Sequence, residues 1–166
     1  MVASRSRRAR TNPATRVTGG DRIRDLLGPP PGLRDSHLTN LTRGSNGQVD
    51  FTSIAAMEDA NGFDGAWNVT AYAVCANTTP NLMTVSAASP ASSANKSATV
   101  SCPTGTLVHS AGAQLTPAGT APLSGSLVID RVAIDPQLRS VTAAAREDHT
   151  RTNDNWSVRA VALCAP

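Results

Sequence analysis

The chain repeats part of its own sequence, and this repeat limits the possible folds more than any other feature. Residues 48–76 align with residues 137–165 at a constant offset of 89 without a gap, and 11 of the 29 positions are identical. Chance agreement at ordinary composition would give roughly two identities. Because repetition over this length means that one structural unit is used twice, we expect two tandem units of about 90 residues.

Both copies contain a stretch in which apolar residues recur at every second position. The motifs AWNVTAYAVCA (66–76) and NWSVRAVALCA (155–165) place Trp, Val, Ala, Ala and Cys at alternate positions. This period of two predicts a strand with those five side chains on one face. Residues 49–58 and 138–147 also read as strands, and the turn-rich stretches 59–66 and 148–155 follow them. Each copy is therefore predicted to end in a hairpin with a long loop.

Short candidate strands fill much of the remaining chain, and no segment has helical periodicity. They are separated by Gly, Pro, Ser and Asn and lie at 82–87, 98–102, 106–109, 113–115 and 127–130. This pattern is typical of an all-β protein with a β-prism, sandwich or barrel-like fold. We expect residues 35–80 to form a first, incomplete unit and residues 81–166 a second unit.

Residues 1–34 differ from the rest of the chain in charge. They carry a net charge of +6, whereas residues 35–166 carry −3. Residues 15–23 match residues 106–115 with one gap, but no Cys-Pro precedes them, and a GPPPG run follows at 28–32. We expect a basic, Pro/Gly-rich arm that is either poorly ordered or a degraded repeat start. The arm lacks interleaved aromatic residues and a recognisable DNA-binding unit, which argues against a nucleic-acid partner.

Three cysteines bear on the compartment of the protein. Cys102 opens the second unit and Cys164 closes it, so we expect these two to form a disulfide, with Cys75 left over. Two alternatives stay open: a bond between Cys75 and Cys102, and three free thiols in a reducing compartment. No Cys/His group has the spacing of a zinc site, and we expect neither a metal nor another cofactor.

The motifs CPxGT (102–106), AxxED (55–59 and 144–148) and WxVxAxAxCA (67–76 and 156–165) carry a resemblance. Together they resemble repeats in secreted or surface-exposed proteins of actinobacteria and in some phage tail proteins, most of them uncharacterised. In its repetition and its pattern of short strands, the chain also has a vaguer similarity to β-prism proteins, including vitelline membrane outer layer proteins. The resemblance implies export and a β-rich repeat fold, and it implies no catalytic residues. The expected location is extracellular or at the cell surface, although the start MVASRSRRAR lacks the apolar region of a signal peptide. No stretch approaches the roughly 18 apolar residues of a membrane span.

Two acidic pairs recur with the repeat, Glu58/Asp59 and Glu147/Asp148. Adjacent residues on a strand point to opposite faces, so one pair cannot converge on a substrate unaided, and we expect a cap or ion pair to the following loop. The stretch DANGFDG (59–65) has the oxygen-rich composition of a calcium loop but not its spacing, which favours a hairpin turn.

The aromatic and histidine side chains give few further signals. The parity of Trp67 and Trp156 places them in the core, whereas Tyr72 lies on the opposite face and is predicted to be exposed. His37, His109 and His149 are isolated from any nucleophile motif and are expected to be surface or hydrogen-bonded residues.

These observations favour a non-enzymatic secreted or surface protein with a structural or interaction role. The alternative is a lectin-like module that binds a glycan or another cell-surface component through loops 59–65, 116–124 and 148–155. Its candidate ligand-binding residues are Asp59, Asn61, Asp64, Tyr72, Asp148 and Arg151. A carboxylate-dependent hydrolase ranks third, and no catalytic residue is assigned.

Overall fold

The computed structural model describes residues 15–17, 36–45, 50–59, 62, 66–77, 80–120, 122–149 and 151–166. These residues hold β-strands and no helix, so the predicted all-β class is confirmed. In chain order the strands are β1 (Thr15–Val17), β2 (Ser36–Ser45), β3 (Asp50–Glu58), β4 (Cys75–Asn77), β5 (Met83–Ala88), β6 (Lys96–Ser101), β7 (Leu107–Pro117), β8 (Leu127–Ile134), β9 (Ser140–Glu147) and β10 (Trp156–Ala165).

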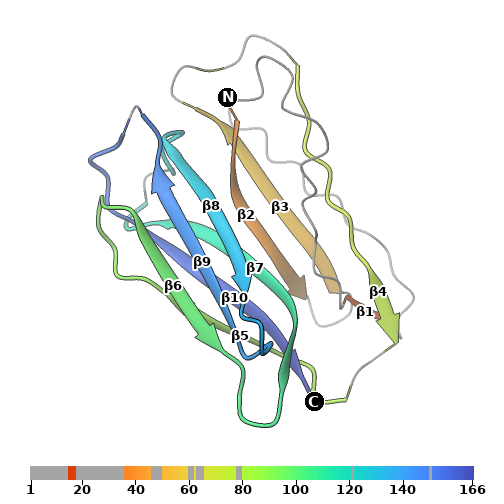
Figure 1. Cartoon of the computed structure of the whole chain (residues 1–166). Coiled ribbons are helices and arrows are strands. Elements are labelled where there is room, and N and C mark those ends of the chain that lie inside the picture. Colours follow the sequence, from red (N-terminus) through yellow and green to blue (C-terminus); the bar gives the residue numbers. More distant parts are fainter. Residues whose placement is uncertain are drawn as a thin grey trace.

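Two sheets packed face to face form a sandwich (Figure 1). One sheet has five strands in the order β3-β2-β7-β10-β5, and the other has three in the order β6-β9-β8. Strands β1 and β4 form a separate two-stranded ladder. Of the expected architectures, the structure has the sandwich, and the described strands form no closed barrel. Strands β5 to β10, all from the predicted second unit, make up most of it.

The core lies between the sheets and is built from small residues. Alternate side chains of β10 point into it, and Val158, Ala160 and Ala162 have no exposed surface. Trp156, 1% exposed, is the largest fully buried side chain. Because aromatic residues make up only 3% of the chain, short Ala and Val side chains let the sheets approach and fill the interior. Trp67 is only half-buried, so the core position predicted for both tryptophans is fully realised in the second copy alone.

The predicted hairpin at the end of each copy is wrong. Strands β9 and β10 lie in different sheets: β9 pairs with β6 and β8, and β10 pairs with β5 and β7. The loop at 148–155 therefore crosses from one sheet to the other. In the first copy, β3 pairs with β2 and has no described ladder to residues 66–77. In the second copy, β9 and β10 each carry an apolar face, and packing on opposite sides of one core buries both faces.

Residues 66–74 were predicted as a strand but belong to no ladder within the described part of the chain. Only Cys75–Asn77 pair, with β1. The alternation is nevertheless present, because Trp67, Val69 and Ala71 are half-buried while Tyr72 is 73% exposed. The segment is extended, as its sequence predicts, but a strand also needs a partner, and the described residues provide one only at its end.

The true hairpins are β2–β3 and β8–β9, and both carry a bulge at a matching place. The β2–β3 register shifts between Leu38 and Asn40, and the β8–β9 register shifts between Ile129 and Arg131. Beyond the bulge, Asn40 pairs with Ala55 and Arg131 pairs with Ala144. In the sequence alignment, Ala144 is the counterpart of Ala55, 89 positions later.

The ladders formed by the closing motifs also match in register. Val17 faces Cys75 in β1–β4, as Val108 faces Cys164 in β7–β10. Two ladders in the first half of the chain therefore have counterparts of equal register in the second half.

The hairpin β2–β3 extends the five-stranded sheet by adding β2 to the edge of β7. The ladder between them is short, joining Asn40 to Gln114 and Leu41 to Ala113. Gly112 makes the approach possible, because a side chain there would collide with the carbonyl oxygen of Leu41. A single small residue thus decides how closely the hairpin can dock.

Candidate functional site at the loop end of the sandwich

The predicted binding loops meet at one end of the sandwich (Figure 1). Gly125, in the β7–β8 connection, packs against the backbone of Glu58 and Asp59, where β3 ends. The amide of Asp148 donates to the carbonyl of Ser126 over 2.8 Å, and the amide of Ala118 donates to the carbonyl of Asn155 over 2.9 Å. The sandwich therefore brings together the loop starting at Asp59 and loops 116–124 and 148–155, although 60, 61, 63–65, 121 and 150 lie outside the described residues.

The turns that follow β3 and β9 are built in the same way. Asp59 Oδ1 accepts from the amide of Gly62 over 3.1 Å, and Asp148 Oδ1 accepts from the amide of Arg151 over 3.3 Å. Gly62 and Arg151 both have positive φ, 71° and 52°. The predicted capping role of the acidic pairs is thus confirmed for both Asp residues. An arginine in this conformation is strained, whereas glycine adopts it freely.

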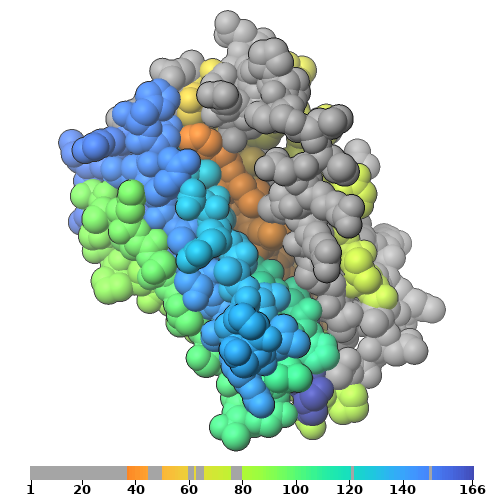
Figure 2. Space-filling model, viewed as in Figure 1, coloured from red at the N-terminus to blue at the C-terminus, as the bar shows by residue number. Residues whose placement is uncertain are grey.

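A polar cleft lies between the β5–β6 and β9–β10 connections. It has a volume of about 330 Å³ and is lined by Ser93, Ala94, Asn95, Glu147, Asp148 and Arg151. Asn95 Oδ1 accepts from the amide of Glu147 over 2.9 Å, which joins the two connections. In Figure 2 the segment before β6 and the segment after β9 lie side by side at this end. Carboxylate, amide and guanidinium groups around one hollow suit a ligand with several hydroxyl groups.

A second, more apolar cleft opens beside Trp156. Its volume is about 210 Å³, and its walls include Pro117, Pro122, Leu123 and Leu127. Asp154 and Asn155 contribute the polar part of its rim. Leu127 of this cleft faces Glu147 of the polar cleft in the β8–β9 ladder, so the two hollows are close neighbours.

Lys96 lies over the ring of Trp156, a residue of the apolar cleft. Its ammonium nitrogen lies 3.2 Å from the centre of the Trp156 ring and donates to the carbonyl oxygen of Ser92 over 2.8 Å. Desolvation lowers the pKa of Lys96, and the nearby charge of Glu147 opposes that effect. The ammonium group thus contacts the indole ring and interacts electrostatically with Glu147.

The repeated Glu and Trp residues make a direct contact in the first copy but not in the second. Trp67 Nε1 donates to Glu58 Oε1 over 2.7 Å. In the aligned pair, Trp156 Nε1 and Glu147 Oε1 are both buried and neither has a hydrogen-bond partner within the described part of the chain. A buried polar atom without a partner costs about 1–3 kcal/mol, so each of these two atoms needs an explanation.

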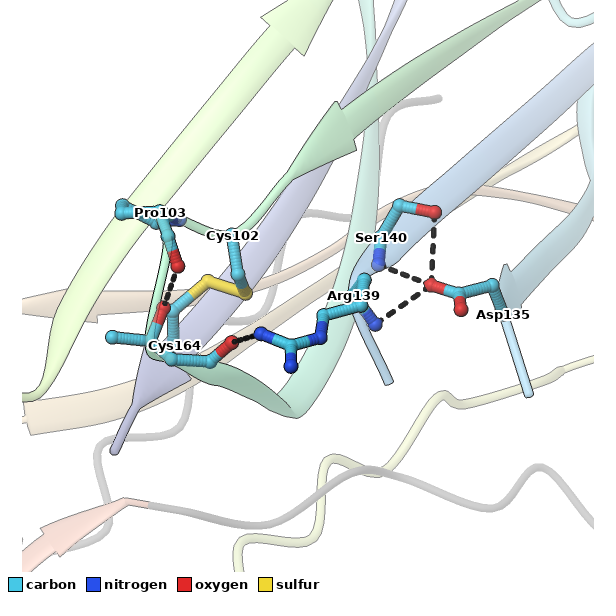
Figure 3. Close-up of a disulfide and its surroundings, with 7 residues drawn as sticks. Cys102, Pro103, Asp135, Arg139, Ser140 and Cys164 are labelled. Carbon is cyan, nitrogen blue, oxygen red and sulfur yellow. Dashed lines mark hydrogen bonds between the residues drawn. A yellow bond between two sulfur atoms is a disulfide. The ribbon is translucent and has the colours of Figure 1, made fainter. Parts of the chain in front are cut away.

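The opposite end of the sandwich carries the predicted disulfide (Figure 3). Cys102 and Cys164 are bonded with a Cα–Cα distance of 5.8 Å, and Cys75 is free. Thr106 closes the CPxGT turn by donating from Oγ1 to the carbonyl of Pro103 over 2.8 Å. The guanidinium of Arg139 donates to the carbonyl of Thr106 over 3.2 Å, which attaches the turn to the β8–β9 hairpin. The disulfide and these hydrogen bonds thus fix the conformation of the motif.

Sequence analysis found part of the loop-end site and missed part of it. Asp148 and Arg151 line the polar cleft, and their role in binding stays a prediction. Tyr72 is exposed as predicted, but it lines neither cleft. Asn61 and Asp64 lie outside the described residues. Asn95, which also lines the polar cleft, was missed, because the β5–β6 connection that carries it lies outside the aligned repeat.

The histidines and other candidate groups add no further site. His37 is buried and its Nδ1 has no hydrogen-bond partner among the described residues, which departs from the surface or hydrogen-bonded role expected for it. His109 and His149 are exposed. Within the described ranges, no three His, Cys, Asp or Glu side chains gather as metal ligands would.

Comparisons with known proteins identify no relative: neither a family model, nor a curated protein, nor a solved structure matches the chain. The part of the chain that the structure describes contains no helix able to cross a membrane.

Proposed function

We propose that the chain is a non-enzymatic, extracytoplasmic interaction module made of two related units. The observation that carries this proposal is the Cys102–Cys164 disulfide, which joins the end of β6 to the end of β10 across the second unit. Such bonds persist in oxidising compartments and are rare in the cytosol. The matched bulges and ladder registers support a duplicated unit.

The test is the thiol state of the protein in its native host. Cells are treated with an alkylating reagent before lysis, and the protein is recovered from the medium, the surface and the cytosol for intact-mass analysis. We expect a surface or medium fraction in which Cys75 alone is alkylated. A cytosolic protein with three alkylated cysteines would refute the proposal.

A second candidate function is glycan recognition at the loop end, and the polar cleft is the observation that favours it. Asn95, Glu147 and Arg151 offer donors and acceptors in a hollow of about 330 Å³, a size typical of small-ligand sites. The apolar cleft next to it supplies walls on which the C–H face of a sugar ring can pack.

A glycan array tests this function with the intact chain. We expect binding to a restricted set of glycans, reduced at least about tenfold in Arg151→Ala, which removes one charged hydrogen-bonding group. The matched control is Arg159→Ala, because Arg159 is exposed on β10 and lines neither cleft. Uniformly negative arrays, or equal losses in both variants, would count against glycan recognition.

A further inference from the structure

The matching registers of the two units identify which edge of β3 corresponds to which edge of β9. β3 aligns with β9 at the offset of 89 residues, and β2 pairs with β3 through a bulge placed like that between β8 and β9. The other edge of β9 is covered by β6, with Lys96 facing Ala145 at one end and Ser101 facing Ser140 at the other (Figure 1). Among the described strands, β3 pairs with β2 alone. The edge of β3 that faces away from β2, its outer edge, is therefore the counterpart of an edge that holds a strand.

The core-facing side chains of β9 are more deeply buried than their counterparts on β3. Three residues of β9 are each at most 3% exposed: Val141, Ala143 and Ala145. The aligned residues of β3 are only half-buried: Thr52, Ile54 and Ala56. A neighbouring strand covers the flanks of the side chains beside it as well as pairing with the backbone. The partial exposure of β3 is therefore what a strand with one described neighbour should show.

The segment that follows β3 lacks a neighbour on the equivalent side. Residues 66–74 form no ladder within the described part of the chain, although the aligned part of β10 pairs with β5. β5 and β6 follow each other in the chain, and the loop between them is bonded to β10, because Ser92 and Trp156 exchange two backbone hydrogen bonds of 3.1 and 3.0 Å. One strand–loop–strand segment, residues 83–101, thus adds a strand to each sheet of the second unit.

We propose that the outer edge of β3 is a docking site for an extended segment of another protein, which pairs with β3 as β6 pairs with β9 and carries a lysine at the position of Lys96. This inference rests on the interaction role proposed above and gives it a partner. Backbone hydrogen bonds supply affinity in such strand addition, and alternate side chains supply specificity. β6 shows the pattern required, because Ala98 and Val100 are buried while Ser97 and Thr99 are exposed.

The charge at the end of β3 favours a lysine in the partner. Glu58 ends β3 as Glu147 ends β9. In the second unit the ammonium nitrogen of Lys96 lies 3.2 Å from the centre of the Trp156 ring and interacts electrostatically with Glu147. In the first unit Trp67 Nε1 donates to Glu58 Oε1 over 2.7 Å. Because Lys96 is the only lysine of the chain, the lysine that meets this first pair has to come from another molecule.

A synthetic peptide with the sequence of residues 83–101 is the probe, because the second unit shows how that segment binds. It is titrated into the full chain with the disulfide intact, and the indole N–H signals of Trp67 and Trp156 are followed by NMR after assignment with Trp67→Phe. We expect saturable binding that shifts the Trp67 signal and leaves the Trp156 signal in place. A peptide carrying Ala98→Pro and Val100→Pro should not bind, because proline cannot donate to a ladder.

The lysine of the peptide tests the part given to Glu58. A peptide carrying Lys96→Ala should bind the wild-type chain about threefold to tenfold more weakly, because it lacks the charge that meets Glu58 and the Trp67 ring. In the chain variant Glu58→Gln the difference between the two peptides should shrink. The matched variant Glu147→Gln should keep the full difference. A difference that is equal in both variants would overturn the docking position.

Absence of binding by the unaltered peptide overturns the inference. A shift of the Trp156 signal alone also overturns it, because the peptide would then be exchanging with β5 and β6 of the second unit. A third contrary result is a chain that sediments as a dimer without peptide and becomes monomeric in Ala56→Lys, since a second copy would then fill the outer edge of β3. The thiol state of the native protein tests the interaction module separately, so the two proposals can fail independently.

Discussion

Asp135 organises the turn between β8 and β9 through its carboxylate. The group accepts hydrogen bonds from the amides of Gln137 and Arg139, over 2.9 and 2.8 Å, and from both the amide and the hydroxyl of Ser140. Desolvation acts to raise the pKa of Asp135, but these hydrogen bonds outweigh it and lower the pKa below the usual value of 3.8. A lowered native pKa means that the ionised group stabilises the fold.

The lowered pKa of Asp135 determines how the stability of the fold should depend on pH. The contribution of Asp135 should be complete above about pH 4, where the unfolded chain is also ionised, and should be lost as the pH falls through the lowered native pKa. Asp135→Asn should therefore melt at a lower temperature than the wild type near pH 7, and the difference should shrink in acid. The control is Asp130→Asn, because the Asp130–Arg146 ion pair is about half exposed on both sides. An equal effect of both variants at every pH would contradict the turn's dependence on Asp135.

At the scale of single strands, the aligned valines of the two closing motifs allow a matched comparison. Val158 is fully buried on β10, which has ladders on both sides, whereas Val69 is half-buried in a segment without a described ladder. We expect Val158→Ala to lower the free energy of unfolding by about 2 kcal/mol, and Val69→Ala by less than about 1 kcal/mol. Urea denaturation measures both. Equal losses would mean that residues 66–74 are packed as tightly as β10.

The docking of the β2–β3 hairpin depends on Gly112. Gly112→Ala should push β2 away from β7, because the added methyl collides with the Leu41 carbonyl. We expect faster hydrogen exchange at the amides of Asn40 and Leu41, while β10 stays protected. Gly119→Ala is the control, since nothing lies near a methyl group at that position. If protection of β2 is retained, its pairing with β7 is not limited by this contact.

Strands could be predicted from the sequence where apolar and polar residues alternate clearly. Which strands pair with one another could not be predicted. Residues 156–165 alternate regularly, and β10 was placed correctly to within one residue. β2 was missed, because its buried positions hold His37 and Thr39 as well as Leu41, which gives no apolar alternation. Nor does sequence show whether a loop folds its strands back in one sheet or crosses to the other, since both bury the same apolar faces.

The candidate site was predictable only in its repeated part. Asp148 and Arg151 stand in a turn-rich stretch that alignment reveals, and this stretch was predicted as a possible ligand-binding loop, without its cleft. The opposite wall comes from residues 93–95, which are distant in sequence and belong to no recognisable motif. Sequence also cannot show that Glu147 and Trp156 lack the hydrogen bond that Glu58 and Trp67 make, because the residue types are identical.

At the scale of the whole molecule, the disulfide closes a loop with a sequence separation of 62 residues. Removing it with Cys102→Ser and Cys164→Ser should lower the free energy of unfolding by about 4 kcal/mol, because the unfolded chain regains the freedom the bond removes. Thermal melting with and without reductant measures the loss. Cys75→Ser should change little, and a wild type that is insensitive to reductant would contradict a stabilising bond.

The place of β10 governs when this protein can fold during synthesis. It lies between β7 and β5 within the five-stranded sheet, yet it is the last of the described strands to be made. Before β10 has been made, β5 lacks its ladder partner among the described strands, and the sheet has a gap between β7 and β5. The five-stranded sheet can therefore be complete only once translation has passed residue 165.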